Sequence, residues 1–223
     1  MNYSEVNMLN SGRENCYIIK GEKGDILIDT GSEEFRDEIE TWLMDYNVKL
    51  IVLTHGHIDH VGNAAYFSEL YKAPIAMGKY DIGFSRRKRI RKLYAMGVRG
   101  MIMKKAIEMS GKNIPEPFMT DIFLEDGMDL GNELGIENCT AVSLEGHTRG
   151  SFGVLHGKDL YLGDAAMNFF GPSFPLICES PQMARKALDK IKELSPERIF
   201  FGHGEPIEAK GPKYRQMFMK TIF

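Results

Sequence analysis

The chain has 223 residues, of which 43% are hydrophobic and 26% charged, and its formal net charge at pH 7 is −3. This length and composition agree with a compact protein that buries a substantial core, although length alone fits one large domain or two small ones. No apolar run approaches the roughly 18 residues of a membrane-spanning helix, and the start shows no basic stretch followed by an apolar run, as a secretory signal would.

In the first part of the chain, short strands are expected to alternate with amphipathic helices. Ser32 is expected to cap a helix that reaches Tyr46, because the apolar residues after it recur at helical spacing. A second helix is expected over residues 59–71. The expected strands are short apolar runs at residues 16–20, 25–29, 49–53 and 73–77.

Residues 79–118 depart from this alternation and are expected to form a helical insert. Its apolar residues predict an amphipathic helix, or a helical pair broken near Gly97 and Gly100. These apolar residues are Ile90, Leu93, Tyr94, Val98, Met101 and Ile102. Residues 85–105 contain nine basic residues and no acidic one, so the rest of the chain is at −12 on the same count. The nine basic residues are Arg86, Arg87, Lys88, Arg89, Arg91, Lys92, Arg99, Lys104 and Lys105.

The second half of the chain repeats the strand-rich pattern. A helix is expected over residues 180–194, with Ser180 as its cap and Pro181 in its first turn. The expected strands are residues 140–144, 152–156, 160–162 and 198–201. The last of these leads directly to His203.

The three cysteines, Cys16, Cys139 and Cys178, are widely separated and form no Cys-x-x-Cys pair. Buried, reduced thiols are therefore expected. Together with the absence of a visible secretory signal, this favours a cytoplasmic location.

A cluster of metal-ligand residues directly follows the expected strand 49–53. Since alternate side chains of an extended segment share a side, His55 and His57 can bind one ion together. If a helix begins near Asp59, then Asp59 and His60 turn toward a second ion about 3.5 to 4 Å away, as in two-metal hydrolytic sites. The other candidates are His147, after Gly146, and His203, after Gly202, which leaves His156 as the remaining histidine.

The types of ligand indicate the kind of metal site. Imidazole nitrogen together with carboxylate oxygen suits zinc, and also iron or manganese. The absence of paired cysteines argues against a closed structural zinc site, so an open, catalytic site with two divalent ions is expected. A solvated or locally satisfied histidine is the simpler interpretation of His156 alone. It does not account for His-x-His-x-Asp-His, which rarely arises by chance.

These motifs resemble, in the same order, those of the metallo-β-lactamase superfamily. They are Ile26-Leu27-Ile28-Asp29-Thr30-Gly31, the His55 to His60 cluster, Gly146-His147-Thr148, Leu162-Gly163-Asp164-Ala165 and Gly202-His203-Gly204. The resemblance implies an α/β fold, also classed as α+β, in which four layers form an αβ/βα sandwich. Because the motifs span residues 29–203, a single domain over residues 1–223 is expected, with the helical insert at about 79–118.

The resemblance also assigns roles to the candidate residues. It places His55, His57 and His147 on one metal and Asp59, His60 and His203 on the other, with Asp164 bridging the two. Asp29 would orient the histidine loop without binding metal, as outer carboxylates commonly do. Asp59 is additionally a candidate catalytic residue that orients the attacking hydroxide and accepts its proton.

The expected reaction is hydrolysis of an ester, thioester, lactone or phosphoester by a metal-bridging hydroxide. Two alternatives stay open: an iron-dependent oxidoreductase of the same fold that resembles persulfide dioxygenases, and a metal-stabilised binding protein. The subfamily stays unassigned, because Met167 replaces the tyrosine of acyl homoserine lactonases and Glu145 replaces the usual proline before Gly-His-Thr.

The basic insert leaves three interpretations open. It is a solvated basic face over an apolar packing stripe, a cap that attracts a small anionic substrate to the metals, or a surface for nucleic acid or anionic lipid. The nucleic-acid version is disfavoured because aromatic residues do not alternate with the basic ones. The sequence does not predict an oligomeric state.

Overall fold

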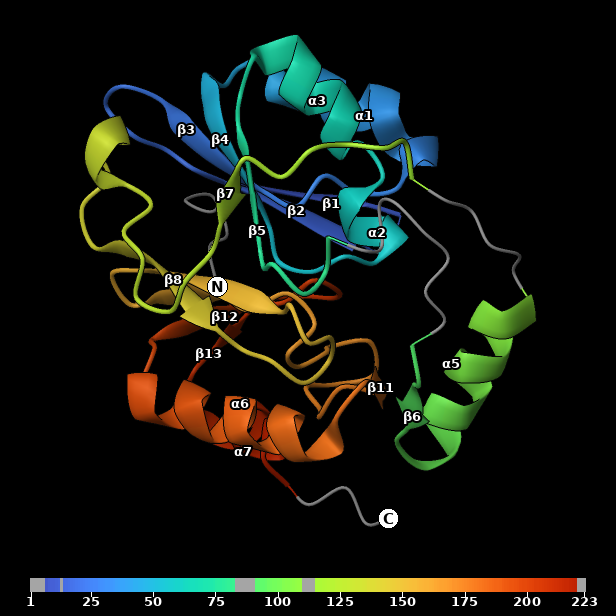
Figure 1. The fold of residues 1–223 in the computed structure, drawn as a ribbon. Coiled ribbons are helices and arrows are strands. Elements are labelled where there is room, and N and C mark those ends of the chain that lie inside the picture. The colour runs from blue at the N-terminus through green and yellow to red at the C-terminus, as the bar shows by residue number, and fades with distance from the viewer. Residues whose placement is uncertain (1–6, 13, 83–90, 110–114, 220–223) are drawn as a thin grey trace.

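Two β-sheets face one another and carry helices on their outer faces, so that the protein has four layers (Figure 1). The computed structural model describes residues 7–12, 14–82, 91–109 and 115–219. Helices α1 and α3 cover the first sheet, and α6 and α7 cover the second. The expected α/β sandwich of the αβ/βα type is thereby confirmed.

The first sheet has six strands in the order β1-β2-β3-β4-β5-β7. From β3 to β7 neighbouring strands are parallel, whereas β1, β2 and β3 pair antiparallel. Their bounds are β1 Met8–Ser11, β2 Glu14–Ile19, β3 Asp25–Ile28, β4 Val48–Leu53, β5 Ile75–Met77 and β7 Ile122–Phe123.

The second sheet has five strands in the order β13-β12-β10-β9-β8. Only β10 and β12 are parallel neighbours in it. Their bounds are β8 Cys139–Ser143, β9 Phe152–His156, β10 Asp159–Tyr161, β12 Arg198–Phe200 and β13 Ile207–Glu208. A short 3-10 helix, Asn132–Leu134, precedes β8.

Strand β2 illustrates how the sequence forms these layers, because all of its residues are buried. Tyr17 and Ile19 point into the core between the sheets, whereas Cys16 and Ile18 point into the core beneath α1 and α3. This alternation follows from the two-residue period of a strand. A strand covered on both faces therefore lacks the polar face of a half-exposed strand.

The helices partly differ from expectation. A 3-10 turn, Glu33–Phe35, precedes α1, which spans Arg36–Leu43 and ends before Tyr46. Ser32 does not cap it, because its hydroxyl instead bonds the carboxylate of Glu14. By contrast, Ser180 caps α6, Pro181–Leu194, as expected, and accepts the N–H of Met183. The last helix, α7, spans Gly211–Met217.

The prediction of a single helix over residues 59–71 is wrong. The segment forms two helices, α2 Ile58–Val61 and α3 Ala64–Tyr71. The chain changes direction at Gly62 and Asn63, where a Cβ on Gly62 would lie 2.7 Å from the carbonyl oxygen of Gly31. The Asn63 side chain donates to that neighbouring turn, including the Thr30 carbonyl at 2.8 Å. This close approach fixes α2 directly against the segment that contains Asp29.

The described part of the insert contains one strand and one helix. Strand β6, Tyr94–Ala95, pairs with β11, Ile177–Cys178, and α5 spans Gly97–Met109. Gly97 begins the helix and Gly100 lies within it, so neither breaks a helical pair. Ile90 and Arg86 to Arg89 lie outside the described residues.

Of the three interpretations of the insert, the basic face over an apolar packing stripe does not fit the described helix α5. Val98, Met101 and Ile102 are 67%, 57% and 66% exposed. Helix α5 instead approaches the body of the protein at Gly100, where a Cβ would lie 2.2 Å from the carbonyl oxygen of Leu176. Val98, Met101 and Ile102 thus lie on the exposed side of α5. Figure 1 shows α5 standing beside the sandwich rather than within it.

All three cysteines are buried and unpaired. Burial raises the pKa of the Cys139 and Cys178 thiols to about 12, so both are unreactive thiols at neutral pH. Within the described residues, none of the helices is long and apolar enough to cross a membrane.

Candidate metal centre

The candidate ligands lie on the segments that follow the carboxyl ends of β4, β8, β10 and β12, with Asp59 and His60 in the short helix α2 and the others on loops. Parallel neighbours deliver their loops to one edge of a sheet, which is where α/β proteins commonly place their sites. The structure brings all seven expected ligands together in three overlapping groups, each with ligand atoms within 4.8 Å of one another. The groups are His55, His57 and His147; Asp59, His60 and His203; and His55, His60 and Asp164. His156 lies on β9, outside these groups.

The first group consists of three imidazoles directed at one point. His57 Nδ1 lies 3.1 Å from His55 Nε2 and 3.0 Å from His147 Nε2. The outer nitrogen of His147, Nδ1, donates to the carbonyl oxygen of Ile177 at 2.9 Å. This bond leaves the lone pair of His147 Nε2 facing the other two rings, as a metal ligand requires.

The second group adds a carboxylate to two imidazoles. His203 Nε2 lies 3.3 Å from Asp59 Oδ2 and 3.4 Å from His60 Nε2. The Asp59 side chain is 35% exposed, whereas those of His60 and His203 are buried. Asp59 is therefore the ligand of this group that solvent reaches most easily.

Asp29 orients the His60 ring through a hydrogen bond to its Nδ1. Its Oδ2 accepts the N–H of His60 Nδ1 at 2.8 Å and the Thr54 hydroxyl at 2.8 Å, while Oδ1 accepts the Thr54 backbone N–H at 2.8 Å. Asp29 lies at φ +57°, a left-handed conformation that aspartate tolerates better than most residues. These contacts agree with the orienting role expected for Asp29.

Asp164 lies between the two groups. Its Oδ2 is 3.5 Å from both His147 Nε2 and His203 Nε2, and its Oδ1 is 3.8 Å from His60 Nε2. Among the described residues, Oδ1 is buried without any hydrogen-bond partner. Burying an unpaired carboxylate oxygen is unfavourable, whereas a cation at this point would satisfy it. The arrangement thus fits two divalent ions that share Asp164.

The two groups differ in proton affinity in the absence of metal. Burial, followed by the neighbouring imidazoles, lowers the pKa of His55 well below its usual value and that of His147 to about 4. Burial acts in the same direction on His60, but Asp29 and Asp59 outweigh it and raise the His60 pKa to about 9. Asp164 and Asp59 likewise raise the His203 pKa above its usual range against the effect of burial. His60 and His203 in turn outweigh burial and lower the pKa of Asp59 and Asp164.

We expect metal binding at the second group to depend more strongly on pH than binding at the first. Metal must displace protons from His60 and His203 at neutral pH, whereas His55 and His147 are already neutral. Below the pKa, affinity should rise about tenfold per pH unit for each displaced proton. Zinc titration calorimetry between pH 6.5 and 8.5, in buffers with different ionisation enthalpies, would measure these protons.

The His203→Ala variant provides the control, because it should abolish the pH-dependent step and leave the first binding step intact. The same variant should reduce at least tenfold the hydrolysis that is expected from the sequence motifs. Two binding steps with equal pH dependence would contradict the assignment of the two groups.

Two residues that hold the ligand loops, Asp81 and Tyr17, were not identified from the sequence. The buried carboxylate of Asp81 accepts the backbone N–H of Gly56 at 3.0 Å and the Thr148 hydroxyl at 2.5 Å, so it joins the loops of His57 and His147. Tyr17 donates its hydroxyl to the Phe201 carbonyl at 2.6 Å and thereby supports the His203 loop. Because their partners are mostly backbone groups on distant segments, these residues have no local sequence signal.

The chain is similar to one family over most of its length. The model of the metallo-β-lactamase superfamily matches residues 10–203. A curated relative, the metallo-β-lactamase fold-containing protein ST1585 of Sulfurisphaera tokodaii, is 30% identical over 209 residues, which cover 87% of this chain and 74% of the relative.

Two further comparisons agree. The crystal structure of TTHA1623 in a di-iron-bound form matches with a TM-score of 0.64 at 25% identity, over 90% of this chain and 92% of that one. The probable metallo-hydrolase YybB of Bacillus subtilis is 42% identical over 60 residues, 26% of this chain and 27% of YybB. Since the family model matches far more than half of the chain, this protein belongs to the metallo-β-lactamase superfamily.

Proposed function

We propose that this protein is a metal-dependent hydrolase of esters, thioesters, lactones or phosphoesters. The observation that carries the proposal is the pair of ligand groups that share Asp164, with the more exposed Asp59 on one side. Two divalent ions held there would lower the pKa of a water molecule toward neutrality and polarise the substrate oxygen under attack. The likeness to a probable metallo-hydrolase supports the same reaction class.

The protonation states of the side chains suit them to bind metal and to position water. His55 and His147 present neutral nitrogens, because burial lowers the pKa of both. Asp59 stays ionised, because its facing histidines outweigh burial and hold its pKa far below the usual range. A partly exposed, ionised carboxylate at this position is suited to orient an attacking water and to accept its proton.

Zinc is the proposed metal, with iron and manganese as alternatives. Nitrogen and oxygen ligands without thiolate suit all three ions. The di-iron form of TTHA1623 favours testing iron directly, and with it an iron-dependent oxidation as the competing function.

The test is a substrate screen on protein loaded separately with zinc, manganese or iron. We expect hydrolysis of at least one nitrophenyl ester, thioester, lactone or phosphodiester, with loss of the activity on chelation. The rate should rise with pH through one ionisation near neutrality. Oxygen consumption with a persulfide by the iron form, without hydrolysis in any form, would establish the oxidoreductase instead.

We further propose that the insert favours anionic substrates through Arg99. The Phe169 ring stacks on His203 at 4.6 Å and lies 6.4 Å from the Phe170 ring, over which the Arg99 guanidinium lies at 4.9 Å. This series of contacts connects the metal ligands with α5. An exposed cation at its outer end would attract an anionic group of a substrate bound at the metals.

Replacing Arg99 with methionine should therefore raise KM several-fold for an anionic ester and leave KM for a neutral ester unchanged. The difference should shrink as ionic strength rises, since salt screens exposed charges. Lys192→Met is the matched control, because Lys192 also lies over a phenyl ring, that of Phe218, but in the last turn of α6, distant from His147. Equal losses on both esters would mean that Arg99 only supports the structure.

A further inference from the structure

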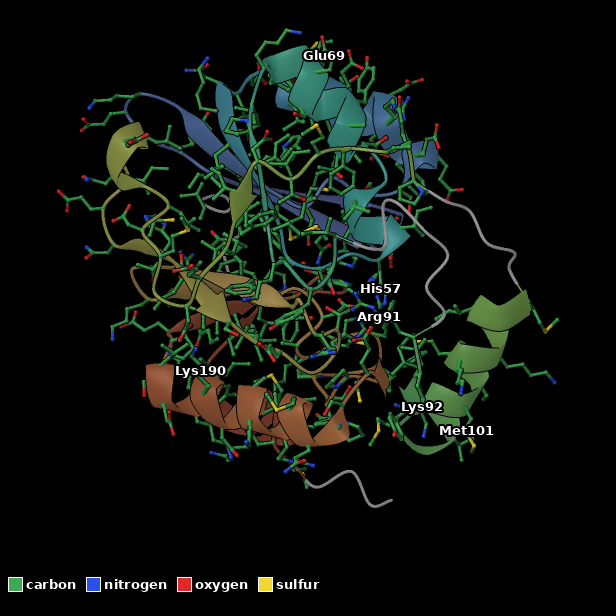
Figure 2. The ribbon with its side chains drawn as sticks, in the orientation of Figure 1. His57, Glu69, Arg91, Lys92, Met101 and Lys190 are labelled. Carbon is green, nitrogen blue, oxygen red and sulfur yellow. The ribbon has the colours of Figure 1, made fainter. Side chains whose placement is uncertain are left out.

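We propose that Arg91 is a positioning residue that couples the insert to the first ligand group, His55, His57 and His147. Together with Asp81 and Glu179 it forms a largely buried group of three charged side chains, called here the Arg91 triad. The inference concerns metal binding, and it rests on the proposed function only in assuming that these histidines hold metal. Figure 2 shows Arg91 beside His57, on the side of the molecule that carries α5.

The Arg91 triad joins one cation to two carboxylates away from solvent. Arg91 Nη1 lies 2.8 Å from Asp81 Oδ1 and 3.0 Å from Glu179 Oε1. The side chains of Arg91, Asp81 and Glu179 are 15%, 0% and 6% exposed. Removing the cation would leave two carboxylates buried against one another, which is strongly unfavourable.

Asp81 connects the Arg91 triad with both ligand loops. Besides Arg91, its carboxylate accepts the backbone N–H of Gly56, between His55 and His57, and that of Gly150 at 3.1 Å. It also accepts the hydroxyl of Thr148, the residue after His147. A Cβ on Gly150 would lie 2.5 Å from Asp81 Cγ, so the loop approaches Asp81 as closely as its backbone allows.

Glu179 connects the Arg91 triad with His147 a second time. Its backbone N–H lies 2.9 Å from the His147 carbonyl oxygen, and its carboxylate accepts the N–H of Arg149 at 2.9 Å. Two residues earlier, Ile177 supplies the carbonyl that orients the His147 ring. Ile177 belongs to β11, which pairs with β6 of the insert.

The insert therefore contacts the segment around His147 through Asp81, through Arg91 and through the pairing of β6 with β11. When two parts of a protein stabilise one another, the coupling is reciprocal. Metal bound at the first group should reduce local opening of the insert, and loss of the Arg91 contacts should weaken metal binding. Because Arg91 already faces two carboxylates, its role differs from the substrate attraction proposed for Arg99.

The first experiment needs no substitution. Amide hydrogen exchange of residues 97–109 is measured in the full chain with and without zinc. We expect slower exchange in α5 when zinc is bound, although no ligand lies on that helix. Unchanged exchange in α5, together with stoichiometric zinc binding, would overturn the coupling.

The second experiment measures zinc affinity by competition with a chromophoric chelator in the His203→Ala background, where only the first group should bind tightly. Arg91→Met should lower this affinity at least about tenfold and abolish the zinc effect on α5 exchange. In Arg91→Lys the affinity should lie between those of the wild type and Arg91→Met, since a lysine keeps the charge that faces Asp81 and Glu179 but lacks the second nitrogen, Nη2, that donates to the Tyr80 carbonyl.

Arg198→Met is the matched control, because Arg198 also pairs with a carboxylate, Asp159, at 2.7 Å and 2.5 Å, but on the surface of the second sheet. It should leave both zinc affinity and the zinc effect on α5 exchange unchanged.

Wild-type zinc affinity and wild-type exchange in Arg91→Met, even with a lower melting temperature, would make Arg91 a purely structural residue. If Arg91→Met does not fold, the zinc affinity of Arg91→Lys and the effect of zinc on α5 exchange in the wild type test the coupling instead. None of these readouts depends on hydrolysis, so a failure of the proposed reaction would leave the coupling intact.

Discussion

Replacing Asp164 with asparagine should leave at most one tightly bound ion per chain and lower kcat/KM at least about a hundredfold. Asp164 is the residue whose carboxylate approaches histidines of both groups, His147 and His203, at 3.5 Å. Asparagine keeps the shape of the side chain but lacks the charge and one of the two oxygens that a shared ligand needs. Both ions should therefore be affected, and the reaction that requires both should suffer most.

Elemental analysis of protein purified under metal-replete conditions would measure this change, alongside steady-state kinetics on whichever ester the screen identifies. Wild-type protein should contain two ions per chain, because seven ligands exceed what one tetrahedral ion can use. Asp159→Asn is the control. Asp159 begins β10, the strand that leads to Asp164, but it pairs with Arg198 instead of the histidines. Two ions and a wild-type rate in Asp164→Asn would exclude a bridging carboxylate.

The ligands could be predicted from the sequence because their chemistry is unusual and their spacing is local. His55, His57, Asp59 and His60 follow one strand directly, and no packing requirement explains them. Strands β2 and β4 were predictable for a similar reason, since short apolar runs between turns indicate buried strands. Such signals are contained within a few neighbouring residues.

The features that the sequence did not predict depend on contacts between distant segments. Gly62 ends a helix because the backbone near Gly31 lies against it, not because of any local breaker pattern. Asp81 bonds the backbone N–H groups of Gly56 and Gly150 and the side chains of Arg91 and Thr148, and these partners are spread along the chain, so no local pattern reveals its role.

In the insert, too, the sequence did not predict which side chains would be covered by other parts of the protein. Helical spacing identified residues that share a face, such as Val98 and Ile102, but not whether anything covers that face. Arg91 resembled the other basic residues of the insert, and its separate role depends on Glu179, which lies 88 residues away.

Replacing Asp29 with asparagine should weaken binding of the second ion by about 10- to 100-fold while sparing the first. Asparagine suits the backbone, because it tolerates the left-handed conformation at φ +57°. Its oxygen would keep the N–H of Thr54, since the opposite orientation would place two donors together. Its amide would then donate toward His60 Nδ1, which must give up its proton. The proton would move to His60 Nε2, the nitrogen that faces His203 and the proposed ion.

Nitrogen-15 chemical shifts of histidine would detect the altered tautomer of His60 in metal-free protein, and zinc competition would measure the second binding step. Asp25→Asn is a matched control, because Asp25 is a buried aspartate at the other end of β3 that accepts backbone N–H groups of Gly21 and Asn47. It should lower stability without changing either binding step. If Asp29→Asn binds the second ion with wild-type affinity, Asp29 serves to hold the turn at Thr54, and the orientation of His60 must come from the packing around its ring.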